Sequence, residues 1–174
     1  MDWSYPIGKY ERKDSLSPTE REAAIAQIAA TPKHLRNAVS GLSQQQLDTP
    51  YRPGGWTVRE VVHHVPDSHM NSYIRFKLAL TEDEPTIKPY EEALWARLQD
   101  SCDTPVEVSL ALLESLHSRW DILLRSLGPE DLSRRLRHPE LGTMTLDNML
   151  GLYAWHGRHH VAHITSLRRR EGWE

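Results

Sequence analysis

The histidines of this sequence are concentrated in one short segment, with the spacing of a metal-binding helix. Four of the ten histidines lie between His156 and His163. They form two pairs four residues apart, His156 with His160 and His159 with His163. Residues four apart lie one above the other on one helix face, so the two imidazoles of a pair can bind one cation without any backbone change. The spacing therefore indicates a divalent metal site with nitrogen ligands.

The first of these pairs is expected to point into the protein. Apolar positions recur every three or four residues in this segment, and the stripe continues through the pair: Leu146, Met149, Tyr153, His156, His160, Ile164 and Leu167. His159 stands about 100° from His160 around the helix and is expected nearer the edge of this face. Two inward imidazoles are costly to bury unless their nitrogens are satisfied, and a divalent metal satisfies them. The alternative is a pair of hydrogen-bonded core histidines.

A third ligand is needed, because zinc generally takes at least three from the protein. The dipeptide His63-His64 in another helical segment is the most direct source. The helix face that carries His64 also carries polar and charged residues: Glu60, Ser68, Asn71 and Arg75. The face that carries His63 has a different set: Arg59, Met70 and Ile74. The pattern favours His64, and a solvated face without a site is the alternative.

Several other chemistries have no support in the sequence. The single cysteine, Cys102, excludes an internal disulfide and a cysteine-rich zinc site. The sequence has no HExxH, GxSxG, GxGxxG, CxxC or Walker A motif. A helical glutamate base, an activated serine, a dinucleotide cofactor and a phosphate-binding loop are therefore not indicated.

Length and composition fit one globular domain over residues 1–174, with 39% hydrophobic and 26% charged residues. The net charge of −3 argues against charge-driven binding of nucleic acid or a membrane surface. No apolar run approaches the roughly 18 residues of a membrane span, and residues 1–10 lack the apolar core of a signal peptide. We therefore expect a cytoplasmic location.

Helix start and stop signals predict four principal helices of roughly 20 to 25 residues each. Each begins after a capping sequence, at residues 17–20, 57–60, 104–107 and 145. The ends are expected near residues 41, 80, 128 and 172, and Pro32 and Pro66 predict bends inside the first two helices. The third helix passes through a series of apolar positions: Val108, Leu112, Leu116, Trp120, Leu123 and Leu127.

The connections complete the expected architecture, an all-α four-helix bundle. Residues 82–105 form a long polar connection between helices two and three, with a short helical piece near residues 90–98. Such a connection can cross the end of a bundle, so these two helices need not be antiparallel neighbours. Residues 134–145 are expected as a loop with a short hairpin.

The chain resembles the DinB-like superfamily, and within it the YfiT type of metal-dependent hydrolase. The resemblance covers nearly the whole length, in order: YPIGKY at 5–10, LDTPYR at 47–52, GGWTVR at 54–59, the run 63–80 and the run 153–164. It implies a bundle of unusual connectivity, a homodimer, and one divalent metal per subunit, zinc or nickel. By the family pattern the ligands are His64, His156 and His160. Pro66 departs from the helix formers expected beside the first ligand.

Three neutral imidazoles leave a metal with an open position, where water loses a proton near pH 7. We therefore expect a hydrolase with a small-molecule substrate. Asp67, Asn71 and Arg75 follow His64 on the same helix, and we expect them to orient water or substrate. The same metal could instead activate a low-molecular-weight thiol for transfer, as the resemblance to bacillithiol-type S-transferases implies. A metal-binding bundle without catalysis is the third alternative.

A pocket could be shaped by Tyr153, Trp155, Arg158 and the loop with His138-Pro139, and ordinary packing or a surface position is the alternative for each of them. Replacement of His117 is expected to leave the metal in place, because His117 is not among the predicted ligands.

Overall fold

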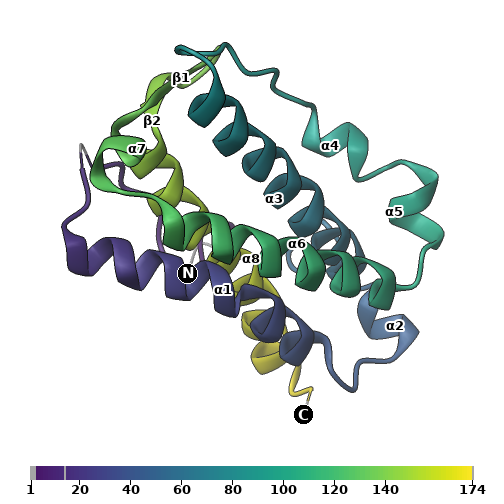
Figure 1. Cartoon of the computed structure of the whole chain (residues 1–174). Helices are drawn as coiled ribbons and strands as arrows, with labels where there is room; N and C mark the ends of the chain where they lie inside the picture. Colours follow the sequence, from purple (N-terminus) through teal and green to yellow (C-terminus); the bar gives the residue numbers. More distant parts are fainter. Residues whose placement is uncertain (1–2, 14, 174) are drawn as a thin grey trace.

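The computed structural model describes residues 3–13 and 15–173 and has the four long helices that the sequence predicts (Figure 1). They are α1 (Pro18–Val39), α3 (Val58–Thr81), α6 (Val106–Ser126) and α8 (Leu146–Glu171). Shorter elements lie between them: α2 (Gln44–Leu47), α4 (Glu92–Trp95), α5 (Gln99–Asp103), α7 (Pro129–Ser133), β1 (Arg135–His138) and β2 (Gly142–Thr145). No helix among the described residues is long and apolar enough to cross a membrane.

The predicted capping sequences begin three of the long helices. The hydroxyl of Thr57 accepts a hydrogen bond from the backbone N–H of Glu60, whose carboxylate accepts one from the N–H of Thr57. The same reciprocal pair begins α1 and α8. The third helix differs, because Pro105 is its N-cap and makes no side-chain cap. Gly172 ends α8 in the left-handed region, at φ 66°.

α1 and α8 run parallel and side by side. Near their starts the guanidinium of Arg21 pairs with Asp147, and near their ends Arg168 donates to the carbonyl of Ala38. Between these contacts Gly157 of α8 leaves room for the side chain of Thr31, which allows a close approach of the two helices.

α3 and α6 also run parallel, which agrees with a connection that crosses the bundle. His63 contacts Ser109 near their starts, and His69 contacts His117 further along. The pair is antiparallel to α1 and α8 (Figure 1). Consecutive long helices α1 and α3 therefore do not pack as neighbours, and each of the four packs against two others. Helix α3 continues through Pro66 without interruption.

The long connection and the hairpin are joined. β1 and β2 pair antiparallel from Arg135 opposite Thr145 to His138 opposite Gly142. The connection runs beside β1. The N–H of Ile87 donates to the carbonyl of Arg137 at 3.0 Å, and the N–H of Arg137 donates to the carbonyl of Pro85 at 2.9 Å. The predicted hairpin is therefore present, and it holds residues 85–87 of the connection beside β1.

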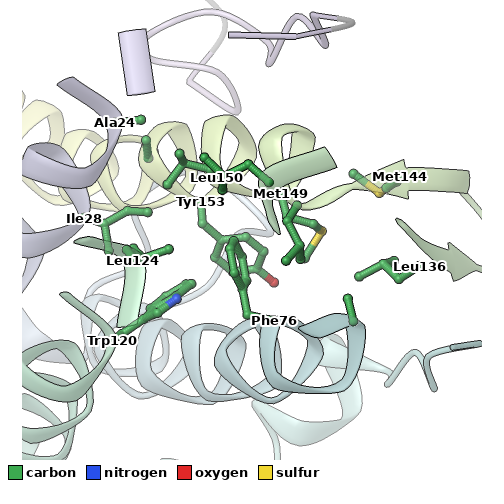
Figure 2. Close-up of a cluster of buried hydrophobic side chains, with 14 of the residues drawn as sticks. Ala24, Ile28, Phe76, Trp120, Leu124, Leu136, Met144, Met149, Leu150 and Tyr153 are labelled. Carbon is green, nitrogen blue, oxygen red and sulfur yellow. The ribbon is translucent and has the colours of Figure 1, made fainter. Parts of the chain in front are cut away.

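The core consists of two hydrophobic clusters with a layer of histidines between them. One cluster, built around Phe76, Trp120 and Met149, lies toward the hairpin (Figure 2). The other, which includes Val61 and Ile164, lies toward α2. Each of α3, α6 and α8 passes from one cluster to the other through histidines that are buried, or half-buried in the case of His156: His64 and His69 on α3, His117 on α6, and His156, His159, His160 and His163 on α8.

The buried face of α6 differs from the apolar positions that the sequence suggested. The inward residues are Leu110, Leu113, His117, Trp120 and Leu124, whereas Val108 and Leu112 are exposed. The stripe is shifted around the helix, and it brings a histidine into the core.

Candidate metal centre

The structure brings three of the predicted residues together in the histidine layer. Each of His64, His156 and His160 offers one ring nitrogen, and these nitrogens lie within 4.8 Å of one another. The Nε2 atom of His156 lies 3.3 Å from that of His64 and 3.2 Å from that of His160. Helical spacing places the last two rings on one face of α8, and α3 supplies the third from across the bundle.

These distances fit a tetrahedral metal. Zinc–nitrogen bonds of about 2.0–2.1 Å give a tetrahedron with edges of roughly 3.3–3.4 Å. The two Nε2–Nε2 distances around His156 are close to that edge. His156 is therefore placed relative to both other donors as a four-coordinate cation requires, and three protein ligands leave a fourth position for another ligand.

Burial favours the neutral rings that a metal needs. It lowers the pKa of His64 to about 4, with smaller contributions from His159 and His163. It holds the pKa values of His156 and His160 well below the usual value of 6.5. At neutral pH the three rings are thus uncharged, with lone pairs available for a cation.

His63, the alternative third ligand, points elsewhere. Its Nδ1 lies 2.7 Å from the hydroxyl of Ser109 on α6, and its ring is buried on that side of α3. The geometry therefore selects His64 from the dipeptide.

A chain of hydrogen-bonded rings extends from His156 across the core. The Nδ1 of His156 lies 3.1 Å from the Nε2 of His69, and the Nδ1 of His69 lies 2.8 Å from the Nε2 of His117. The Nδ1 of His117 lies 2.7 Å from the carbonyl oxygen of Ile28 on α1. We call this chain the histidine relay: His156, His69, His117 and the Ile28 carbonyl.

The carbonyl at its end fixes the direction of the relay. A carbonyl oxygen only accepts, so His117 donates from Nδ1, and burial keeps this ring neutral by lowering its pKa to about 4. Its Nε2 must then accept from the Nδ1–H of His69, whose own Nε2 accepts from the Nδ1–H of His156. The lone pair of His156 therefore remains on Nε2, the atom that faces His64 and His160.

Pro32 explains why the Ile28 carbonyl is available. In a helix this carbonyl would accept from the N–H four residues later, and proline has none. The hydrogen bond from His117 replaces the missing helical bond. A residue that the sequence identifies as a bend thus also provides the anchor of the relay.

A cavity of about 300 Å³ opens beside the three histidines. Its walls include the rings of Trp56 and Trp155, and the polar side chains of Ser68 and Tyr153. The hydroxyl of Ser68 lies 3.4 Å from both the Nε2 of His156 and the hydroxyl of Tyr153. A small molecule in this cavity would reach the ring nitrogens.

The structure separates the three residues that the sequence suggested for orienting water or substrate. Arg75 lines the cavity. Asn71 does not line it, and its side chain donates to the backbone carbonyl of Asp67. The carboxyl of Asp67 also lies outside the lining; burial and then the charge of Asp100 raise its pKa to about 6. Spacing along one helix face placed these side chains together, but the connection with α4 and α5 covers part of that face.

The expected pocket walls are also divided. Tyr153, Trp155 and His138 line the cavity, whereas the described lining does not include Pro139 or the exposed Arg158. Arg158 bonds back to its own helix, at the carbonyl of Ala154.

His159 is more buried than its expected place at the helix edge, with 7% of its surface exposed. Trp155 stacks on its ring and Tyr5 of the amino-terminal segment contacts it. That segment lies along α8, where Trp155 donates to the carbonyl of Gly8 and the ring of His163 bonds with the carbonyl of Ser4. Helical periodicity carries no information about such a covering segment.

Sequence reasoning missed two residues of the relay, His69 and His117. His69 and His117 are fully enclosed polar side chains in the core, and burial lowers the pKa of both. The available signal was the spacing of His117 with Leu113 and Trp120, which marks an inward position on α6.

A larger cavity, of about 670 Å³, lies at the α2 end of the bundle. Arg36, Arg59 and Glu107 are among its lining residues, and the described lining contains no histidine. We assign the site by its chemistry, which places it at the smaller cavity.

Comparisons with known proteins identify the family of the chain. A family model described as the DinB superfamily matches residues 27–164. A protein of Bacillus cereus (strain 03BB102) with the name "Putative metal-dependent hydrolase" is 59% identical over 172 residues, which are 99% of each chain. A Bacillus anthracis (strain A0248) protein of the same name has the same identity and coverage.

Two solved structures are similar. YfiT from Bacillus subtilis, described as a probable metal-dependent hydrolase with an unusual four-helix bundle topology, matches with a TM-score of 0.97 and 51% identity over 100% of both chains. The four-helix bundle protein TT2238 matches with a TM-score of 0.58 and 20% identity, over 84% of this chain and 98% of that one. The second likeness concerns the fold alone.

Proposed function

Because this chain belongs to the DinB superfamily, we propose that it hydrolyses a small-molecule substrate at a divalent metal held by His64, His156 and His160. One observation carries the proposal: three ring nitrogens from two helices converge within 4.8 Å of one another beside an open cavity. We propose one metal per chain. Zinc is the first candidate and nickel the second, since imidazole suits both.

The donor set fits a catalytic site better than a structural one. Structural zinc sites have four protein ligands, whereas catalytic sites have three and an open position. A cation bound here would lower the pKa of a water molecule toward 7 and polarise a carbonyl group.

Other residues of the chain orient the ring of His156 and surround the three histidines. The relay holds a proton on the Nδ1 of His156 and so keeps that ring in one tautomer and orientation. The hydroxyls of Ser68 and Tyr153 lie next to that ring, where they can bond to the water or to the substrate. Trp56, whose ring centroid lies 4.6 Å from that of His64, places an apolar ring beside this histidine in the cavity wall.

Metal content tests the ligand set. The purified protein is loaded with zinc or nickel, treated with a mild chelator and examined by elemental analysis. We expect about one metal per chain in the parental protein and nearly none after His64→Ala, His156→Ala or His160→Ala. His34→Ala is the matched control, because His34 is an exposed histidine of α1. Equal metal content in all five proteins would refute the assignment.

Turnover tests the reaction class. The metal-loaded protein is assayed with a panel of esters and amides and, in parallel, with a low-molecular-weight thiol and an electrophile. We expect hydrolysis that is lost with His156→Ala. Turnover with the thiol pair alone would replace the hydrolase with an S-transferase at the same metal, and stoichiometric metal without any turnover would favour a non-catalytic bundle.

A further inference from the structure

Arg75 is a buried cation in the wall of the cavity. Only 8% of its surface is exposed, and it lies on α3 as His64 does. Burial of a guanidinium is costly unless a negative charge accompanies it. Among the described residues no carboxylate forms an ion pair with Arg75, although nine other ion pairs are present.

Arg75 also has more hydrogen-bond donors than it uses within the described part of the chain. A guanidinium has five N–H donors. Within the described part of the chain the one hydrogen bond from Arg75 joins Nη2 to the backbone carbonyl of Lys88, at 3.2 Å. That contact holds the connection against α3, and it leaves donors of the fork for another acceptor.

The acidic residues near the cavity do not fill this role. Glu92 and Glu140 line it, but both are exposed and neither pairs with Arg75. The charge of Arg75 instead acts on His138 of β1, whose pKa is lowered first by burial and then by this guanidinium. The end of the cavity at the hairpin therefore holds a buried guanidinium without an ion-pair partner among the described residues, and its planar fork is suited to a carboxylate or phosphate.

We propose that Arg75 binds an anionic group, a carboxylate or a phosphate, at one end of the substrate while the reacting group lies at the three histidines. This inference rests on the proposed function and names the substrate class. It also sets a length. Arg75 lies eleven positions after His64 on α3, so their Cα atoms lie about 16 Å apart along the helix. Both side chains line the same cavity, so a substrate of up to about that length can join the guanidinium to the ring of His64.

A probe with a metal-binding group at one end and a carboxylate at the other tests the proposal. Suberic acid monohydroxamate has six methylene groups between its hydroxamate and its carboxylate. Its primary amide is a neutral match of nearly the same shape, and acetohydroxamate reports the metal centre alone. Binding to the zinc-loaded protein is measured by calorimetry and by the fluorescence of Trp56 and Trp155, which line the cavity.

We expect the carboxylate probe to bind about 10- to 100-fold more tightly than the amide, the range for a charge-assisted bond to a buried guanidinium. Arg75→Gln should bring this ratio close to one while the affinity for acetohydroxamate stays the same. Arg75→Lys should retain part of the preference. Arg158→Gln, which changes an exposed arginine outside this cavity, should leave the ratio unchanged.

Equal affinities of the two long probes for the parental protein would overturn the proposal, and so would a preference that survives Arg75→Gln. If Arg75 has a purely structural role, Arg75→Gln should lower the affinity for all three probes alike, and this result would also count against the proposal. Failure of acetohydroxamate to bind the parental protein is a different result. It would refute the metal centre and with it the substrate role of Arg75.

Discussion

His117→Phe tests whether the histidine relay acts on the metal. Phenylalanine keeps an aromatic ring, somewhat larger than imidazole, but removes both nitrogens. The change breaks two of the three hydrogen bonds of the relay, the one to Ile28 at 2.7 Å and the one to His69 at 2.8 Å. The chain then no longer determines which nitrogen of His156 carries the proton. A metal would bind to a ring whose tautomer and orientation are not fixed in advance.

The expected effect is divided between stability and affinity. Two buried hydrogen bonds are worth about 2 kcal/mol together, so the free energy of unfolding of the metal-free protein should fall by at least that amount. Loss of such a partner of a metal-bound histidine typically weakens metal binding by about 10- to 100-fold. We therefore expect retained but weaker zinc binding, and a smaller loss with His117→Gln, which keeps an amide donor and acceptor.

Chemical denaturation of the metal-free protein gives the first quantity, and competition with a chromophoric chelator gives the zinc dissociation constant. His34→Phe is the matched control on the surface of α1. Pro32→Ala tests the same relay from its other end, because it restores an N–H that competes with His117 for the Ile28 carbonyl. That variant should be more stable but should bind zinc a few-fold more weakly.

An unchanged dissociation constant in His117→Phe, together with the expected loss of stability, would refute the reasoning. The relay would then be a structural network of the core. The expectation from sequence was that replacement of His117 leaves the metal in place, and this result would agree with it.

Two further predictions concern stability. The free energy of unfolding of the metal-free protein should decrease as the pH falls from 6.5 toward 4. Burial lowers the pKa of three histidines to about 4 in the folded protein, so in this pH range they bind more protons in the unfolded chain: His64, His117 and His159. Each of these histidines contributes up to about 1.4 kcal/mol of unfolding free energy per pH unit. Asp67, whose pKa is raised to about 6, acts in the opposite direction with one proton. An unfolding free energy that stays constant over this pH range in denaturant titrations would contradict the prediction. Gly157→Ala would place a methyl group 2.6 Å from the Oγ1 of Thr31 and should cost about 1–3 kcal/mol. Thermal unfolding of the double variant with Thr31→Ala should recover most of that loss, and equal stability of the single and double variants would speak against the clash.

Local signals were enough to locate the long helices and their ends. A capping pair such as Thr57 and Glu60 involves residues three apart, so it can be recognised without the rest of the molecule. The same holds for Gly172 at the end of α8. The inward face of α8 was also predictable, because Tyr153, His156 and His160 continue one stripe.

The face of α6 could not be assigned as securely. This helix carries apolar residues on more than one side, and Val108, at 55% exposure, fits a stripe as well as Leu110 does. Only packing against α1 and α3 decides between these stripes. The choice matters for function, since it turns His117 toward His69.

The sequence by itself determined the helices, the pair of histidines on α8 and the chemistry of nitrogen ligands, because each depends on residues within one or two helical turns. Only the tertiary structure decided which histidine of α3 joins that pair, that Asp67 and Asn71 lie outside the cavity and that Arg75 lies in its wall. It also joined Pro32 to the metal centre through two rings from other helices. These relations depend on how helices far apart in the sequence pack together, and periodicity within one helix does not contain that information.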